Sequence, residues 1–424
     1  MLHSGVGLAI AQRLLLDRSA GKNESVQGWT VVLACRNQAK AEAARKQLLK
    51  KEPQATVDII PLDTSSIQSV INASETIAKQ YSRLDVLFCN AGAMPIKGLN
   101  IPGCIRGLLT HPVEFFGTSE ALHQKVGVKS RDGLGMTFAT NVAGHYFMIK
   151  ILEPLMERTP GESRIIWTGS AASELEFDPS DIEHLKGDKP YESSKYIIDQ
   201  VSVYLDNKYA GTKIRSFTTE PGNVCSGFVD PISNPILKVL IVVVFYLVRL
   251  ISGSIRLTIT AYNGSISNHY VATAPAETLD ARLKYYSSIS RLGEQGFVAP
   301  FPVKYDEANA RIIVQYLDRI FADARNPIPD QNSNSDTRRG IGINKGTRLL
   351  FPIIPRIYGS LERHMDAWHC GGTGLQIPAR ISTSEASART QQDEIFLAFT
   401  SGQDVTILTW VYAARKAVAT VYGG

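Results

Sequence analysis

Tyr191 and Lys195 carry the clearest potential for proton chemistry in this chain. The run Tyr191-Glu192-Ser193-Ser194-Lys195 places them four residues apart, so on a helix both side chains lie on one face, about one turn from each other. A free tyrosine has a pKa near ~10, and it needs a cationic neighbour to exchange protons near neutral pH. Tyr and Lys at this spacing also occur on ordinary solvated helix faces, so the other motifs of the chain must decide.

Those motifs follow one another in a fixed order, and most of them come just after apolar runs. They are Ser4-Gly5-Val6-Gly7, Ala34-Cys35-Arg36-Asn37, Leu62-Asp63-Thr64, Asn90-Ala91-Gly92, Asn141, Gly169-Ser170 and Pro221-Gly222. On a layered α/β scaffold, functional residues gather in loops at the carboxyl ends of parallel strands. The order of the motifs therefore predicts one site assembled from several strand ends.

The elements that must position these residues alternate between strand and helix. This alternation predicts a doubly wound α/β fold with a parallel sheet covered on both faces. The predicted strands are Trp29–Cys35, Val57–Leu62, Leu84–Asn90, Arg164–Ser170, Lys213–Glu220 and a short one near Leu283–Ser287. The predicted helices are Leu8–Arg18, Gln38–Lys50, Ser65–Tyr81, Gly135–Met156, Tyr191–Lys208 and Asp306–Ala322.

Together these motifs resemble the short-chain dehydrogenase/reductase family, over roughly residues 4 to 325. The resemblance implies a Rossmann-like fold and a catalytic tetrad of Asn141, Ser170, Tyr191 and Lys195. It implies that Tyr191 donates a proton to a developing alkoxide, while Lys195 lowers the pKa of Tyr191 and contacts the nicotinamide ribose. Ser170 would then bind the carbonyl oxygen, and Asn141 would hold a water that relays protons.

Three serines of this region are candidates for the catalytic position. The family's usual Ser-to-Tyr spacing of about thirteen residues would place it at Asp178, which has no hydroxyl. Ser170 ends a predicted strand, as the role requires, and residues 172–189 then form an inserted loop. Ser173 and Ser180 are the alternatives, although Ser180 lies in an Asp-Pro-Ser turn.

The cofactor residues predicted by the resemblance lie at the other strand ends. Gly5 and Gly7 precede a helix whose N-terminus can bind a pyrophosphate. Arg36 follows the second family strand, where an Arg pairs with the 2′-phosphate of NADP, and no acidic residue occurs between Trp29 and Ala41; we therefore expect NADPH. The remaining predicted cofactor contacts are Asp63, Asn90, Ala91, Gly92, Tyr191, Lys195, Pro221 and Gly222.

Residues 93–135 form a long insertion between the Asn90 turn and the Asn141 helix. This insertion, Ile166-Trp167-Thr168 and the apolar segment after Gly222 look like the 3-keto-steroid reductases of sterol biosynthesis. That likeness implies NADPH-dependent reduction of a 4-methyl or 4-demethyl 3-oxo sterol to the 3β-alcohol in C-4 demethylation. It also implies an enzyme of the endoplasmic reticulum membrane, on its cytosolic face, or of lipid droplets, beside a methyl oxidase, a decarboxylase and a scaffold protein.

Residues 236–251 are apolar, and Lys238 and Arg249 flank the uncharged core Val239–Val248. That core is too short for a hydrocarbon layer of ~30 Å, and both cations can snorkel. We expect a helix lying on the membrane surface; a buried substrate-pocket helix and a true span are the alternatives.

Both ends of the chain depart from the family pattern. The first strand, which precedes the glycine turn and is central in the sheet, is missing, so we expect that the sequence starts downstream of the natural N-terminus. We predict an NADP-binding catalytic domain over residues 1–326. Residues 327–424 form an extension without a motif, which we expect to be partly disordered.

Composition limits the alternatives. An apolar fraction of 44% and a net charge of +5 without a basic run fit a soluble enzyme and argue against nucleic-acid binding. The five scattered cysteines have no zinc spacing, so we expect no metal and a reducing compartment, and no signal peptide is evident. Two rival hypotheses remain: a reductase for another lipid carbonyl, and a weakly active scaffold of the sterol enzymes.

Overall fold

The computed structural model describes residues 5–19, 30–110, 115, 120–173, 177–224, 235–325 and 395–399. All of these belong to one of two units of the chain, the one made of Met1–Arg338 and Asp393–Gly424. The rest of the predicted C-terminal extension lies outside the described residues.

An eight-stranded sheet forms the centre of this unit, in the order β2-β1-β10-β3-β6-β7-β8-β9. Every neighbouring pair is parallel except β8 and β9, which are antiparallel. The strands are β1 (Thr30–Cys35), β2 (Thr56–Pro61), β3 (Val86–Cys89), β6 (Ser163–Thr168), β7 (Ile214–Glu220), β8 (Leu283–Ile289), β9 (Gly296–Pro302) and β10 (Ile395–Phe399). The predicted parallel sheet is confirmed, and the antiparallel edge strand β9 was not predicted.

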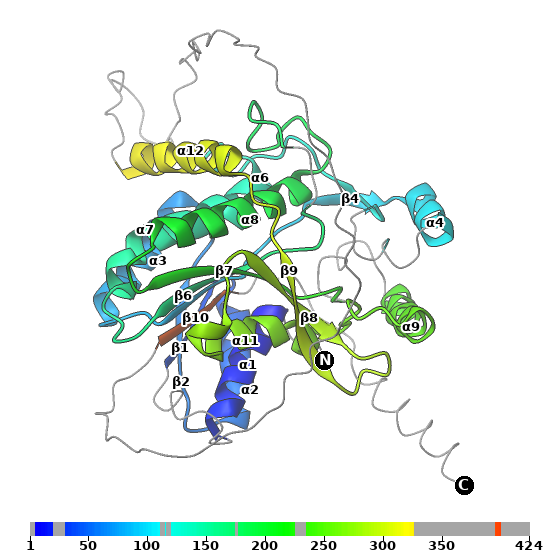
Figure 1. The fold of residues 1–424 in the computed structure, drawn as a ribbon, viewed down its shortest axis with the longest axis horizontal. Coiled ribbons are helices and arrows are strands. Elements are labelled where there is room, and N and C mark those ends of the chain that lie inside the picture. Colours follow the sequence, from blue (N-terminus) through cyan, green and yellow to red (C-terminus); the bar gives the residue numbers. More distant parts are fainter. Residues whose placement is uncertain are drawn as a thin grey trace, which may run out of the picture. The chain divides into compact units, whose positions relative to one another are not determined.

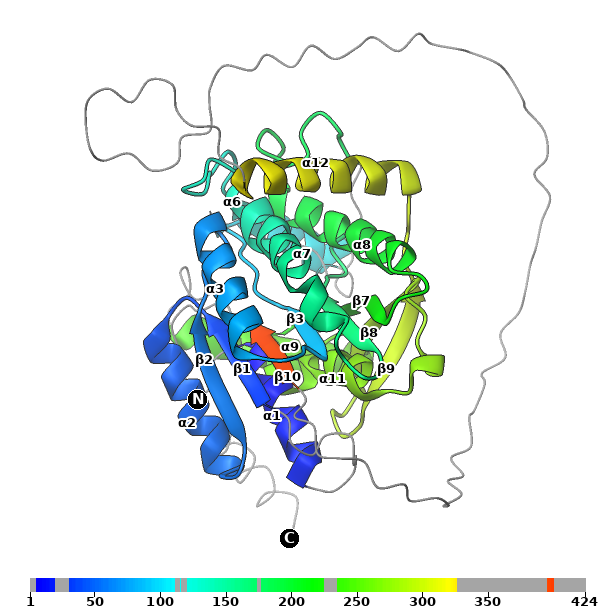
Figure 2. The ribbon, with the colours of Figure 1, turned by 90° about the vertical axis from the view of Figure 1, so that its left-hand side faces the viewer.

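Helices cover both faces of the sheet (Figures 1 and 2). One face carries α3 (Ile67–Gln80), α7 (Gly144–Met156) and α8 (Pro190–Lys208), with α12 (Glu307–Arg325) packed outside α8. The other face carries α1 (Val6–Ser19), α2 (Gln38–Lys51) and α11 (Ile266–Thr273). The short elements are α6 (Met136–Phe138), α10 (Ala261–Gly264) and the 3₁₀ turn η4 (Ala276–Thr278). This is the doubly wound arrangement that the sequence predicts.

Local sequence explains why these helices form where they do. Asn37 caps α2, because its side-chain oxygen accepts a hydrogen bond from the Lys40 backbone N–H at 3.0 Å. Pro190 occupies the first turn of α8, where no backbone donor is needed, and Lys208 lies in the last turn, where a cation favours the helix dipole. The predicted catalytic pair therefore lies in the first turns of a helix that begins at a proline.

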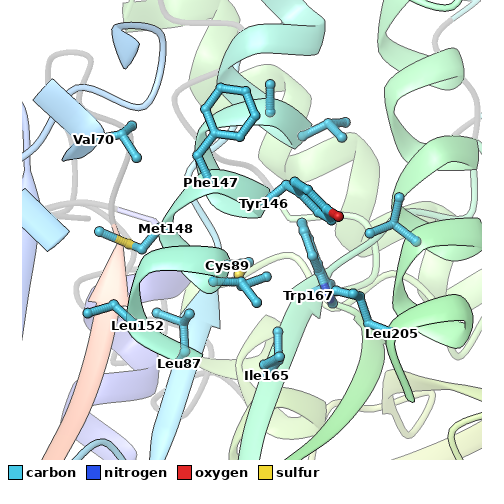
Figure 3. Close-up of a cluster of buried hydrophobic side chains, with 14 of the residues drawn as sticks. Val70, Leu87, Cys89, Tyr146, Phe147, Met148, Leu152, Ile165, Trp167 and Leu205 are labelled. Atoms are coloured by element: carbon cyan, nitrogen blue, oxygen red, sulfur yellow. The ribbon is translucent and has the colours of Figure 1, made fainter. Parts of the chain in front are cut away.

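The larger core lies between the sheet and the α3–α7–α8 face (Figure 3). Trp167, Tyr146, Phe147 and Leu87 are completely buried there. The Tyr146 hydroxyl is satisfied by a hydrogen bond of 2.7 Å to Asp318 on α12. This packing fixes β6 and α8, the two elements that carry Ser170 and the Tyr191–Lys195 pair.

The strand predicted to be missing has a substitute from the far end of the sequence. Residues 1–4 lie outside the described residues, and β10 occupies the gap between β1 and β3. It runs parallel to both, with Val31 opposite Phe396 on one side and Phe396 opposite Val86 on the other. The predicted extension therefore contributes a central strand to the predicted catalytic domain, a difference that local sequence patterns could not reveal.

One predicted helix differs in the structure. The helix expected over Gly135–Met156 is interrupted by a π-helical turn, η2 (Ala139–Ala143), which contains Asn141. The insertion 93–135 holds a two-stranded hairpin of β4 (Ile96–Leu99) and β5 (Leu122–Gln124), with α4 (Ile101–Thr110) between them.

The apolar segment forms helix α9 (Pro235–Ser252), which projects from the sheet domain in Figure 1. Its described apolar side chains are largely exposed: Val243 at 46%, Leu247 at 50% and Ile251 at 79%. These exposures argue against the alternative of a buried pocket helix. In the part of the chain that the structure describes, no helix is long and apolar enough to cross a membrane.

Candidate active site

Tyr191 and Lys195 lie on one face of α8, as their spacing predicts. The Lys195 ammonium stands 5.4 Å from the centre of the Tyr191 ring and donates a 2.7 Å hydrogen bond to the carbonyl of Thr168, the last residue of β6. Lys195 is only 5% exposed, and burial lowers its pKa to about 8, against the opposing effect of Asp199. The helix and the adjacent strand end together fix the ammonium.

Ser170 reaches the same point from the loop after β6. Its side chain hydrogen-bonds the phenol of Tyr191, and its Oγ accepts from the Ala172 backbone N–H at 3.1 Å. Ser173 instead accepts a hydrogen bond from Lys284. Ser180 lies in an exposed turn, where its backbone N–H donates to the Asp178 carboxylate. The geometry therefore places Ser170, and neither alternative, beside Tyr191.

The environment of Tyr191 differs from the expectation in one respect. Burial raises the pKa of its phenol, and the hydrogen bond from Ser170 only partly offsets this effect. Lys195 was expected to lower this pKa, but desolvation of the phenolate at this half-buried ring has the larger effect. Tyr191 is therefore held in its protonated form.

Asn141 connects two parts of the site. Its side-chain oxygen accepts from the Ala93 N–H at 2.7 Å, and its amide group donates to the Ala93 carbonyl at 3.1 Å and to the Ser194 hydroxyl at 2.9 Å. Both amide N–H donors are thus used within the protein. The residue ties the loop after β3 to α8, and a relay water would have to bind some other group of this residue.

The insertion also supports the catalytic helix. Gln124, at the end of β5, accepts a 2.9 Å hydrogen bond from the Tyr191 backbone N–H. Its amide group donates to the buried Glu192 carboxylate at 2.6 Å. Gln124 therefore satisfies a donor of the first helical turn that has no partner inside the helix. Sequence reasoning missed this contact, because nothing in the insertion distinguishes Gln124.

The predicted cofactor residues lie at the strand ends on both sides of Tyr191. Asn90 accepts from the Thr168 hydroxyl at 3.1 Å, and the Ala91 carbonyl lies 2.8 Å from the His145 ring nitrogen Nε2. Gly92 is close to Asn141, with 3.4 Å between an added Cβ and the amide oxygen. These contacts shape the turn after β3.

Gly222 is required by the backbone in the turn after β7. Its φ is +71°, a left-handed conformation, and an added Cβ would lie 2.6 Å from the Arg256 carbonyl. The preceding Pro221 carbonyl accepts from the Thr258 hydroxyl at 2.9 Å. The Pro-Gly pair is thus held by the segment that follows α9.

At the opposite end of the predicted cofactor site, Arg36 follows β1 and Asp63 follows β2. The Arg36 side chain is 62% exposed and only loosely paired with Asp63, at 3.8 Å. Asp63 also receives hydrogen bonds from the Ser65 N–H and hydroxyl, so it helps to shape the turn before α3. Gly7 is buried in α1, and an added Cβ on Gly5 would lie more than 4 Å from every atom that the structure describes around it.

These residues fit a nicotinamide dinucleotide. The N-terminus of α1 has no acidic residue in its first turn, and no atom of the described residues lies within 4 Å of an added Cβ on Gly5. Arg36 presents an exposed guanidinium at the next strand end. Lys195 lies beside Tyr191, where the resemblance noted from the sequence implies the nicotinamide ribose. The site thus provides a cationic end for the phosphates and a polar, proton-exchanging end for the nicotinamide.

Comparison with known proteins agrees with this fold. Residues 2–235 match the short chain dehydrogenase family, and the chain belongs to it. It is an oxidoreductase that uses a nicotinamide cofactor.

The chain is similar to several reductases of this family. It is 34% identical to the human protein named 3-keto-steroid reductase/17-beta-hydroxysteroid dehydrogenase 7, over 74% of this chain and 89% of that protein. It is 27% identical to 3-keto-steroid reductase erg27 of Schizosaccharomyces pombe, over 69% of this chain and 86% of that protein. A third relative, 3-keto-steroid reductase ERG27 of Saccharomyces cerevisiae, is 31% identical over 56% of this chain and 68% of its own length.

Proposed function

We propose that this protein reduces the C-3 ketone of a sterol intermediate to the 3β-alcohol with NADPH, in the C-4 demethylation stage of sterol synthesis. The names of its relatives support the substrate class. The observation that carries the proposal is the contact between Ser170 and a protonated Tyr191 above the buried Lys195 ammonium. This is a proton donor beside a group that can bind a carbonyl oxygen.

Ser170, Tyr191 and Lys195 each have a separate role in the proposed ketone reduction. The nicotinamide, when bound, supplies the hydride. The hydroxyls of Ser170 and Tyr191 bind the carbonyl oxygen, and Tyr191 gives it a proton as negative charge develops there. The Lys195 ammonium, below the ring, stabilises the phenolate that remains.

The protonation state of Tyr191 is the one that ketone reduction requires. A reductase needs a protonated donor, and burial raises the pKa of this phenol. Alcohol oxidation would need the phenolate, which the same burial disfavours. The site therefore suits ketone reduction near neutral pH.

The preference for NADPH rests on Arg36. Its guanidinium is exposed at the end of β1, where it can pair with a 2′-phosphate through two parallel hydrogen bonds. Its nearest anionic partner in the described residues is Asp63, at 3.8 Å, a contact weak enough to be replaced by a phosphate.

The proposed location is the cytosolic face of the endoplasmic reticulum membrane or the surface of lipid droplets, beside the other C-4 demethylation enzymes. A sterol partitions into lipid, and the exposed apolar side chains of α9 can lie in the interfacial region. Substituting Val243 and Leu247 with Asp should release the protein from phosphatidylcholine vesicles in a flotation assay. Full retention of this variant would argue against α9 as the contact.

The test of the activity is NADPH consumption with zymosterone or its 4-methyl precursor in detergent. Tyr191→Phe should lower kcat by about 10²–10⁴-fold, because the proton donor is lost. Tyr196→Phe is the matched control: its hydroxyl accepts from Asn309 at 3.0 Å, outside the site, so turnover should persist.

The other outcomes select between the rival hypotheses. A folded protein that binds NADPH but reduces neither sterol would favour another lipid carbonyl as the substrate. A folded protein that does not bind NADPH would favour a scaffold role.

A further inference from the structure

A second buried lysine lies beside the tetrad, on a different strand. Lys284 on β8 is 4% exposed, and it forms a cluster with Asp199 on α8 at 5% and Glu220 at the end of β7 at 3%. Lys195 completes the cluster at 5%. Two cations and two carboxylates thus balance one another in the interior, where unpaired charges would be costly.

Lys284 uses its ammonium to hold the catalytic loop. It donates to the Ser170 carbonyl at 3.0 Å, to the Ser173 hydroxyl at 2.9 Å and to the Asp199 carboxylate at 2.6 Å. An ammonium has three donors, and these contacts occupy all of them. The main chain of Ser170 is therefore tied to β8, although Ser170 itself follows β6.

Asp199 orients this ammonium and faces the tetrad as well. It follows Lys195 by four residues on α8, so Tyr191, Lys195 and Asp199 share one helix face. The turn at Gly169 lies close to it, since an added Cβ would be 3.5 Å from an Asp199 oxygen. The carboxylate thus lies between the two lysines and the Ser170 loop.

We propose that Lys284, oriented by Asp199, is a positioning residue for carbonyl reduction. It holds the Ser170 main chain so that the Ser170 hydroxyl meets the Tyr191 phenol. It also neutralises Asp199, so that Lys195 stays directed to Thr168 and the Tyr191 ring and is not drawn into an ion pair with Asp199.

The charge balance predicts opposite effects from the two partners. Lys284→Met removes a cation that disfavours the Lys195 ammonium, so the pKa of Lys195 should rise. Asp199→Asn removes an anion and has the reverse effect. The other charged or titratable groups that face these residues are Glu192 on α8, His145 on α7, Glu220 on β7 and Arg256.

The experiment measures kcat, KM for NADPH and the pH profile of ketone reduction in each variant. Lys284→Met should lower kcat about tenfold or more with little change in KM, because the Ser170 hydroxyl is misplaced. The alkaline limb, where Lys195 with its pKa of about 8 loses its proton, should move to higher pH in Lys284→Met and to lower pH in Asp199→Asn.

Two further variants separate positioning from simple structural support. Lys284→Met combined with Asp199→Asn should restore the alkaline limb and leave kcat low, because the charge is balanced but the Ser170 carbonyl still lacks its donor. Lys284→Met combined with Ser170→Ala should be less than additive in kcat, since Lys284 acts through Ser170.

Three results would overturn the inference. The first is a folded Lys284→Met with wild-type kcat and pH profile. The second is a low kcat with an unmoved alkaline limb and additive behaviour with Ser170→Ala. If Lys284→Met does not fold, an unmoved limb in folded Asp199→Asn has the same consequence.

The inference rests on the proposed ketone reduction but not on the sterol. If the wild type reduces no 3-oxo sterol, the proposed function fails. The same profiles are then measured with cyclohexanone or another simple ketone that the wild type reduces.

Discussion

The tetrad side of this protein and its dinucleotide side are built in different ways. On the tetrad side, Lys195, Asn141 and Lys284 are at least nine-tenths buried and bonded to neighbouring elements. On the dinucleotide side, Arg36 is 62% exposed, and an added Cβ on Gly5 would meet no atom of the described residues within 4 Å.

This difference separates two demands of catalysis. Groups that act on developing charge must already be in place, because reorganisation in the transition state costs rate. Groups that bind a flexible anionic ligand can be ordered by the ligand itself. The tetrad side therefore depends on the fold, whereas the dinucleotide side depends chiefly on exposed charge and open backbone.

The largest effect should come from breaking the sheet between the two sides. Leu397, in the middle of β10, is opposite Val32 on β1 and Leu87 on β3. Leu397→Pro removes a ladder N–H from a central strand and should lower the free energy of unfolding by about 3 kcal/mol or more. Thermal unfolding followed by circular dichroism measures this loss.

Gln391→Pro is the control for this substitution, since it lies before the residues of β10. It should leave the unfolding temperature close to that of the wild type. Equal unfolding temperatures for Leu397→Pro and the wild type would show that β10 does not support the sheet.

A smaller effect should come from His145, which joins the two sides through its contact with Ala91. Burial lowers the pKa of His145 to about 4, from an ordinary value of 6.5. Between these values the unfolded chain binds the proton and the folded chain does not, so stability is lost as the pH falls from 6.5 towards 4. The loss attributable to His145 should approach about 3 kcal/mol.

Urea unfolding at pH 7 and pH 5 measures this dependence. His145→Gln should lose less stability over this interval than the wild type does. His123→Gln alters an exposed histidine and should keep the wild-type dependence. An unchanged dependence in His145→Gln would contradict the assignment.

The smallest effect should come from the exposed Arg36. Arg36→Glu replaces a phosphate partner with an acceptor for a ribose hydroxyl, so the preference for NADPH over NADH should fall by about tenfold or more. Stability should hardly change, because the side chain is exposed. The ratio of kcat/KM for the two cofactors measures the effect, and a constant ratio would remove Arg36 from the cofactor site.

Local spacing explains what the sequence could predict. The four-residue step from Tyr191 to Lys195 and the serine at a strand end are short-range patterns, and the structure brings these residues together. The same step continues to Asp199, so that residue could have been found. Lys284 is the single charged residue in a strand of apolar and hydroxyl-bearing side chains. Such a lysine is equally typical of an exposed position on an edge strand, so the sequence did not indicate that it is buried beside the site.

Long-range pairing explains what the sequence could not predict. The sequence of β10 does not indicate that this strand lies between β1 and β3. The pairing joins Phe396 to Val31 and Val86, which are hundreds of residues away in the chain, and no local pattern encodes it. The π-helical turn at Asn141 also escaped prediction. The segments before and after this turn are both helical, and the sequence pattern does not mark the single extra residue between them.

The origin of β10 has a consequence for how the protein is made. The ribosome synthesises β1 and β3 long before Phe396, so the two strands lack the partner between them while most of the chain emerges. Unpaired strand edges invite pairing with other chains. Contacts between residues so distant in sequence also form slowly. The nascent protein should therefore depend on chaperones until β10 has been synthesised.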